Sequence, residues 1–125
     1  MAKTIMIIDD SASLRQVVGI ALTSAGYEVL EACDGQDALD KLGSLNGLKI
    51  HLMLCDVNMP NLDGISFLKA LRQNPGYKFT PVIMLTTEAG EDKKKEGQAA
   101  GARAWVVKPF KPEQLLLAVS KLILP

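Results

Sequence analysis

The sequence has few of the residues on which sulfur or imidazole chemistry depends. Its 125 residues include two cysteines and one histidine, and aromatic residues make up 5% of the chain. Cys33 and Cys55 form neither a disulfide framework nor a metal-ligand spacing, and we expect both to be buried free thiols. His51 has no second histidine or cysteine close to it in the sequence. We expect it to be a structural residue within an apolar strand, which disfavours zinc sites and histidine-dependent nucleophiles.

An excess of charge and a long apolar run are also missing. The 14 Lys and Arg residues balance the 14 Asp and Glu residues, whereas a general nucleic-acid binder is normally basic. No apolar run approaches the roughly 18 residues that a membrane span needs. We therefore expect a cytoplasmic protein that binds neither nucleic acid nor membrane. The two halves differ, because residues 1–64 hold 4 basic and 9 acidic side chains, whereas residues 65–125 hold 10 and 5. This asymmetry is consistent with an acidic site in the first half and a basic partner surface in the second.

Short apolar runs alternate with amphipathic segments from one end of the chain to the other. The runs predict strands over residues 5–8, 27–33, 50–55, 82–85 and 104–107. Between them, apolar residues recur with helical spacing, as in the stripe of Leu14, Val17, Val18, Ala21 and Leu22. Five repeats of strand and helix predict an α/β fold with a parallel sheet covered by helices on both faces. We expect one domain over residues 1–125, with no output domain.

Polar residues follow the predicted strands at the points where the strands end. Asp9 and Asp10 follow the first strand, Asp56 follows the third, Thr86 the fourth and Lys108 the fifth. In open parallel sheets, ligands bind beyond the carboxyl ends of the strands. We therefore expect three carboxylates, a hydroxyl and an ammonium group to meet at one edge of the sheet.

These groups together favour phosphoryl transfer. Three neighbouring carboxylates repel one another unless a cation compensates them, and an all-oxygen ligand set suits Mg²⁺. A carboxylate is a competent nucleophile toward phosphorus. Lys108 and the hydroxyl of Thr86 could hold the phosphoryl oxygens while charge develops on them.

Four motifs extend this interpretation to a family. They are Asp9-Asp10, residues 56–60 (DVNMP) with Asp63-Gly64, Leu85-Thr86, and residues 106–110 (VVKPF). With these four motifs in this order, the chain resembles the receiver domains of bacterial two-component signalling, of the single-domain CheY chemotaxis type. The resemblance spans nearly the whole chain. It implies a flavodoxin-like, doubly wound sheet of five parallel strands in the order 2-1-3-4-5, with five helices.

The resemblance also assigns roles to residues. It implies that Asp56 is the phosphoacceptor and that Lys108 pairs with the phosphoryl group, with Thr86 as the third catalytic residue. Mg²⁺ would be held by the carboxylates of Asp10 and Asp56 and by the backbone carbonyl of Asn58, whereas Asp9 would act mainly through metal-bound water. The peptide bond between residues 108 and 109 is expected to be cis.

The same resemblance implies a switch and a partner surface. Thr86 is the expected switch, together with Trp105, which stands where the family commonly has a tyrosine that turns inward on activation. The partner surface is expected to include Arg103, Trp105, Lys108 and Lys111. Asn58 and Glu88 are expected to tune the rate at which the phosphoryl group is lost to water.

The sequence leaves one main interpretation and several alternatives. In the main one, a histidine kinase phosphorylates a monomeric response regulator, which signals by protein contact with a target such as the flagellar motor switch. Such a protein promotes its own phosphorylation and dephosphorylation but is not a conventional enzyme. The close alternatives are a shuttle in a phosphorelay and a receiver cut from a longer protein. More distant ones are a haloacid-dehalogenase-type phosphatase, which needs an Asp-x-Asp pair after the first strand, and a flavodoxin-like binding module, which needs a Ser/Thr/Gly-rich loop there.

Overall fold

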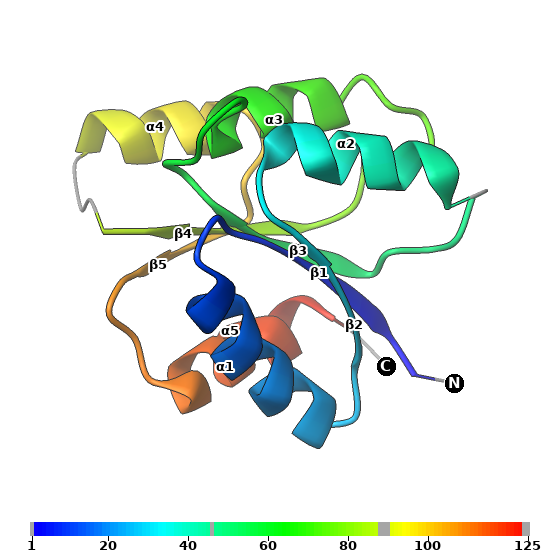
Figure 1. The fold of residues 1–125 in the computed structure, drawn as a ribbon. Coiled ribbons are helices and arrows are strands. Elements are labelled where there is room, and N and C mark those ends of the chain that lie inside the picture. The colour runs from blue at the N-terminus through cyan, green and yellow to red at the C-terminus, as the bar shows by residue number, and fades with distance from the viewer. Residues whose placement is uncertain (1, 46, 88–90, 124–125) are drawn as a thin grey trace.

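The fold is a parallel sheet between two layers of helices (Figure 1). The computed structural model describes residues 2–45, 47–87 and 91–123. The described elements are β1 (Thr4–Ile8), α1 (Ala12–Ser24), β2 (Glu28–Ala32), α2 (Gly35–Ser44), β3 (Leu52–Asp56), α3 (Gly64–Leu71), β4 (Val82–Thr86), α4 (Glu91–Ala99), β5 (Ala104–Val107) and α5 (Pro112–Leu122). The strands pair in parallel in the order β2-β1-β3-β4-β5. The predicted fold class and strand order are therefore confirmed.

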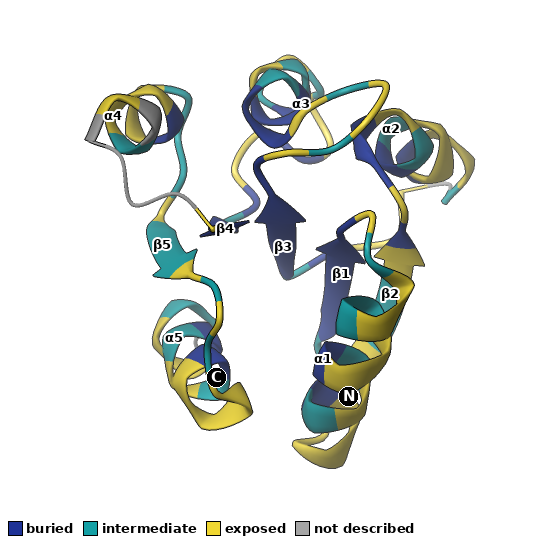
Figure 2. Ribbon diagram, turned by 60° about the vertical axis from the view of Figure 1, so that its left-hand side comes forward, coloured by how far each residue is buried: buried dark blue, intermediate teal, exposed yellow. Residues whose placement is uncertain are grey.

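The core forms on both faces of the sheet because alternate side chains of each strand point to opposite sides. Met6 and Ile8 belong to the cluster beneath α2, α3 and α4, whereas Ile5 and Ile7 belong to the cluster beneath α1 and α5. Every residue of β1, β3 and β4 is buried, which Figure 2 shows as three dark strands in the middle of the sheet. Continuous apolar runs are the sequence signature of such doubly covered strands.

The helices begin at residues whose side chains can accept backbone hydrogen bonds. The hydroxyl of Ser11 accepts from the backbone N–H of Leu14, and the carboxylates of Asp34 and Asp63 cap α2 and α3 in the same way. Pro112 stands in the first turn of α5, where a missing N–H costs nothing. The described helices run from 8 to 13 residues, and none of them is long and apolar enough to cross a membrane.

Some local predictions are wrong, each for a physical reason. Cys33 is exposed rather than buried, because it follows the edge strand β2 and only one side of that strand is paired. His51 precedes β3 instead of lying within it, and its Nδ1 accepts a hydrogen bond from the backbone N–H of Thr4 at 3.0 Å. Val17 is 56% exposed, because the buried stripe of α1 is narrower than the apolar pattern suggests.

Candidate functional site

The carboxyl edge of the sheet brings the predicted acidic residues together. Asp9 follows β1 directly and Asp56 is the last residue of β3, its neighbour in the sheet. Asp9, Asp10 and Asp56 each offer a carboxylate oxygen, and these oxygens lie within 4.8 Å of one another. Asp9 is fully buried and Asp56 is 6% exposed, whereas Asp10 is exposed to solvent. An all-oxygen cluster that is open on one side fits Mg²⁺, which keeps several of its waters.

Lys108 provides the positive charge at this edge. Its Nζ lies 2.8 Å from Oδ2 of Asp9 and 3.4 Å from Oδ1 of Asp56. Burial lowers the pKa of Lys108, but the hydrogen bond to Asp9 and the charges of both carboxylates outweigh it, so the pKa is raised overall. The backbone N–H of Lys108 donates to the carbonyl of Thr86 at 2.6 Å. The bond between Lys108 and Pro109 is cis, as expected.

Asp56 is held in an environment that opposes its ionisation. Burial is the largest cause and the negative charge of Asp9 adds to it, so that the pKa of Asp56 rises from 3.8 to about 6 despite the opposing effect of Lys108. Near neutral pH the carboxylate is therefore ionised but poorly stabilised. Binding of a cation, or a reaction that removes the negative charge of the carboxylate, relieves this unfavourable state.

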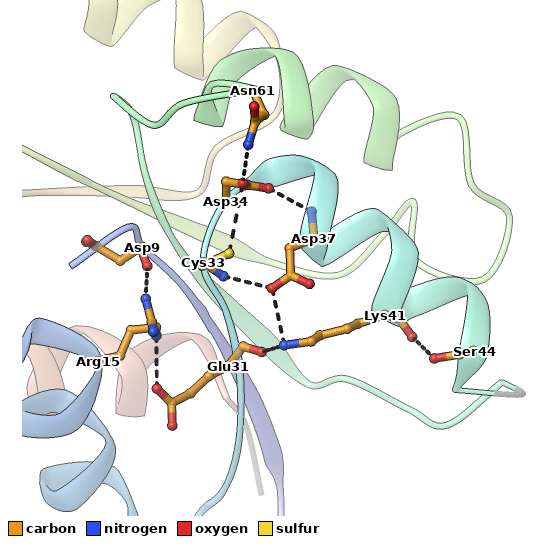
Figure 3. A network of polar contacts seen from close by, with 9 residues as sticks. All are labelled: Asp9, Arg15, Glu31, Cys33, Asp34, Asp37, Lys41, Ser44 and Asn61. Atoms are coloured by element: carbon orange, nitrogen blue, oxygen red, sulfur yellow. Dashed lines mark hydrogen bonds and ion pairs between the residues drawn. The ribbon is translucent and has the colours of Figure 1, made fainter. Parts of the chain in front are cut away.

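The turn that carries Asp9 is fixed by contacts that the sequence pattern did not reveal. Oδ1 of Asp9 accepts from the backbone N–H of Ser11 at 2.9 Å, and its carbonyl accepts from Nη1 of Arg15 at 2.6 Å. Nε of Arg15 also contacts Oε1 of Glu31 at 3.1 Å (Figure 3). The role of Arg15 depends on a partner 16 residues away in the chain, on a neighbouring strand. Apolar periodicity carries no signal for such a pair.

The loop after β3 (residues 57–63) folds closely against the end of that strand. The backbone N–H of Gly64 donates to the carbonyl of Val57 at 2.9 Å. A Cβ at Gly64 would collide with the backbone carbonyl oxygen of Asp56, so this position has to be glycine. Asn58, expected to offer its carbonyl to Mg²⁺, lies in this loop two residues beyond Asp56.

The predicted switch residues lie on β4 and β5. Thr86 is fully buried at the end of β4 and pairs with Val107. The Trp105 ring packs against Gly97 of α4, so closely that a Cβ on Gly97 would overlap it. The indole Nε1 of Trp105 is buried and has no hydrogen-bond partner in the described part of the chain.

The expected partner surface is largely accessible. Arg103 and Lys111 are exposed, on either side of β5, whereas Lys108 is directed to the acidic cluster. Trp105 is half-buried. Glu88, expected to tune the loss of the phosphoryl group, lies outside the described residues.

Comparisons with known proteins all point in one direction. A family model described as response regulator receiver domain matches residues 5–120. The chain is 36% identical to the chemotaxis protein CheY1 of Helicobacter pylori over 112 residues, which cover 89% of each protein. It is 36% identical to protein PilG of Pseudomonas aeruginosa over 115 residues, covering 92% of this chain and 83% of PilG. The crystallised chemotaxis protein CheY4 of Vibrio cholerae is 45% identical and superposes with a TM-score of 0.91, covering 98% of this chain and 99% of CheY4.

Proposed function

The chain belongs to the response regulator receiver domain family, and we propose that it accepts a phosphoryl group from a histidine kinase onto Asp56 in a Mg²⁺-dependent reaction. A receiver domain implies a histidine kinase partner and is a response regulator module rather than a conventional enzyme. The carrying observation is that Asp56 is a buried carboxylate within 3.4 Å of Lys108, in a cluster with Asp9 and Asp10. We propose likewise that residues 1–125 form one receiver domain.

The proposed step is a displacement at phosphorus. A carboxylate oxygen of Asp56 forms a bond to phosphorus, while the bond between phosphorus and the imidazole nitrogen of the donor breaks. The electron pair stays on that nitrogen, which takes up a proton. Lys108 already lies beside Asp56, so its ammonium group can follow the charge onto the phosphoryl oxygens. Mg²⁺, held by Asp10, Asp56 and the carbonyl of Asn58, with Asp9 acting through water, would neutralise the remaining charge.

We further propose that the signal leaves by protein contact in chemotaxis, with the flagellar motor switch as target. Two relatives are named as chemotaxis proteins, which supports this role. The hydroxyl of Thr86 would turn toward the phosphoryl group, and the rearrangement would reach Trp105 and the exposed Arg103 and Lys111. The phosphorylated form would act as a monomer in the cytoplasm. Measured affinity for a flagellar switch protein should rise on phosphorylation, and an equal affinity of both forms would refute the proposed target.

The phosphorylation itself can be tested with a small phosphoryl donor. Trp105 is the only tryptophan, so its fluorescence is followed while Mg²⁺ and then acetyl phosphate are added. Intact-protein mass measures the phosphoryl adduct in parallel, and Asp56→Asn is the control. We expect an adduct and a fluorescence change that need both additions and are absent from the variant.

Each outcome has a distinct meaning. No adduct in the unsubstituted protein would refute Asp56 as an acceptor from small donors. An adduct that persists in Asp56→Asn would place the acceptor elsewhere. An adduct without a fluorescence change would support Asp56 as the acceptor and would refute the proposal that Trp105 takes part in the switch.

A further inference from the structure

Hydrogen bonds connect the outer part of the loop of residues 57–63 to the start of α2. Nδ2 of Asn61 donates a hydrogen bond to Oδ2 of Asp34 at 2.8 Å. Figure 3 shows Asn61 pointing from this loop toward Asp34. One residue further on, the backbone N–H of Gly35 donates to the carbonyl of Leu62 at 3.2 Å. A side-chain contact and a backbone contact therefore join the loop to α2.

Asp34 is a well-fixed anchor for this contact. Its side chain caps α2 by accepting from the backbone N–H of Asp37 at 2.7 Å, and only 6% of the residue is exposed. The bond from the Asp37 backbone, followed by the amide of Asn61, lowers the pKa of Asp34. Asp34 is therefore a carboxylate that stays charged, and its oxygens have donors that hold them in one orientation.

Both sides of the contact have a backbone that only a few residues allow. Asn61 has a φ of 66°, in the left-handed region that non-glycine residues enter at a cost and that asparagine tolerates best. At Gly35, a Cβ would lie 2.7 Å from the carbonyl oxygen of Leu62, too close for any other residue without a shift. The residue types at Asn61 and Gly35 therefore allow the loop of residues 57–63 to approach the start of α2 closely.

The same loop carries Asn58, whose backbone carbonyl is a ligand of Mg²⁺ in the proposed function. The base of this loop is closed by the bond from Gly64 to Val57, and the hydrogen bond from Asn61 to Asp34 holds its outer part against α2. We propose that Asp34 and Asn61 are positioning residues for the Mg²⁺ site: their hydrogen bond holds the carbonyl of Asn58 in place, although neither residue touches the ion. This inference rests on the proposed function.

The first test replaces Asn61 with the isosteric Asn61→Asp. Two carboxylates then face each other where an amide donated before, and the loop should move away from α2. Mg²⁺ itself is the probe, titrated into the unphosphorylated protein while the backbone amide signal of Asp10 is followed by NMR. Partners that orient metal ligands are typically worth at least tenfold in affinity, so we expect the dissociation constant for Mg²⁺ to rise by about tenfold.

The second test reverses the hydrogen bond. In the double variant Asp34→Asn with Asn61→Asp, the amide is on α2 and the carboxylate is on the loop, so the pair can form again. Asparagine caps helices as well as aspartate does, so α2 should keep its start. We expect the double variant to recover most of the affinity for Mg²⁺ that Asn61→Asp loses.

Two further variants separate positioning from charge and from folding. Asn74→Asp adds the same charge in the turn beyond the far end of α3, and it should leave Mg²⁺ binding unchanged. Asn61→Gly keeps the left-handed backbone and removes the amide, so it should weaken Mg²⁺ binding with little effect on urea unfolding. General destabilisation would instead lower the unfolding midpoint without this selective loss.

The outcomes distinguish a failure of the proposed positioning role from a failure of the proposed function. Unchanged Mg²⁺ affinity in Asn61→Asp and Asn61→Gly would overturn the inference alone. A double variant that binds no better than Asn61→Asp would also overturn it, because the two residues would then not act as a pair. If the unsubstituted protein binds no Mg²⁺, the proposed function fails and the inference fails with it.

Discussion

Replacing Asp56 with asparagine should stabilise the fold near neutral pH when no divalent cation is present. In the folded chain, Asp56 is buried and faces the charge of Asp9, and these two effects raise its pKa from 3.8 to about 6. Each pKa unit corresponds to about 1.4 kcal/mol, so ionising Asp56 costs the folded state about 3 kcal/mol. Solvent at the open side of the cluster reduces this cost, and we expect Asp56→Asn to gain about 1–2 kcal/mol.

The gain has a defined pH dependence. Below about pH 4 the carboxyl group is protonated in both the folded and the unfolded chain, and the variant should have little advantage. Between about pH 4 and about pH 6 the unfolded chain loses this proton first, so the stability of the unsubstituted protein falls as pH rises. Above about pH 6 the difference should be complete and constant.

Urea unfolding measured by Trp105 fluorescence across this pH range, in the presence of a chelator, provides the assay. Asp10→Asn removes an exposed carboxylate of the same cluster and is the matched control, with an expected effect of about 0.5 kcal/mol or less. Mg²⁺ should reduce the difference in unfolding free energy between Asp56→Asn and the unsubstituted protein, because it stabilises the folded form of the unsubstituted protein. Equal stability of Asp56→Asn and the unsubstituted protein at pH 7.5, or a difference independent of pH, would refute the reasoning.

Three other perturbations test separate features. Lys108→Met removes the ammonium group beside Asp56 and should slow adduct formation from acetyl phosphate about 100-fold by intact mass; an unchanged rate would contradict its proposed catalytic role. In the folded protein a disulfide reagent should reach Cys33 and not Cys55, which is buried and should react only after unfolding. The reaction of Cys33 should be slow at neutral pH, because partial desolvation and neighbouring carboxylates raise the pKa of its thiol. Gly64→Ala should lower the free energy of unfolding by about 3 kcal/mol in urea, because its methyl group would meet the carbonyl of Asp56, and a neutral effect would be inconsistent with that contact.

The strand ends were predictable because two simple rules coincide there. Continuous apolar runs identify buried parallel strands, and each run in the middle of the sheet stops at a polar residue at the carboxyl edge. Asp9 follows one such run and Asp56 ends another, so their proximity follows once the two strands are neighbours. Lys108 reaches the same edge from the end of β5, which is adjacent to neither β1 nor β3. In the sequence, only its position directly after β5 indicated that it would lie at this edge.

The polar contacts around the site could not be predicted in this way. Asn61 and Asp34 are 27 residues apart, and both belong to polar stretches whose partners no periodicity specifies. Arg15 lies on a helix whose apolar stripe says nothing about the carbonyl that it contacts. The pKa of Asp56 depends on burial and on three neighbouring charges at once, so it requires the folded geometry.

Lys108 follows the edge strand β5, and its ammonium group contacts both Asp9, which follows β1, and Asp56, the last residue of β3. One side chain thus joins the residue that follows β1 to the last residue of β3. β5, which carries Trp105, ends at the residue before Lys108, so these ion pairs tie the end of an edge strand to the centre of the sheet.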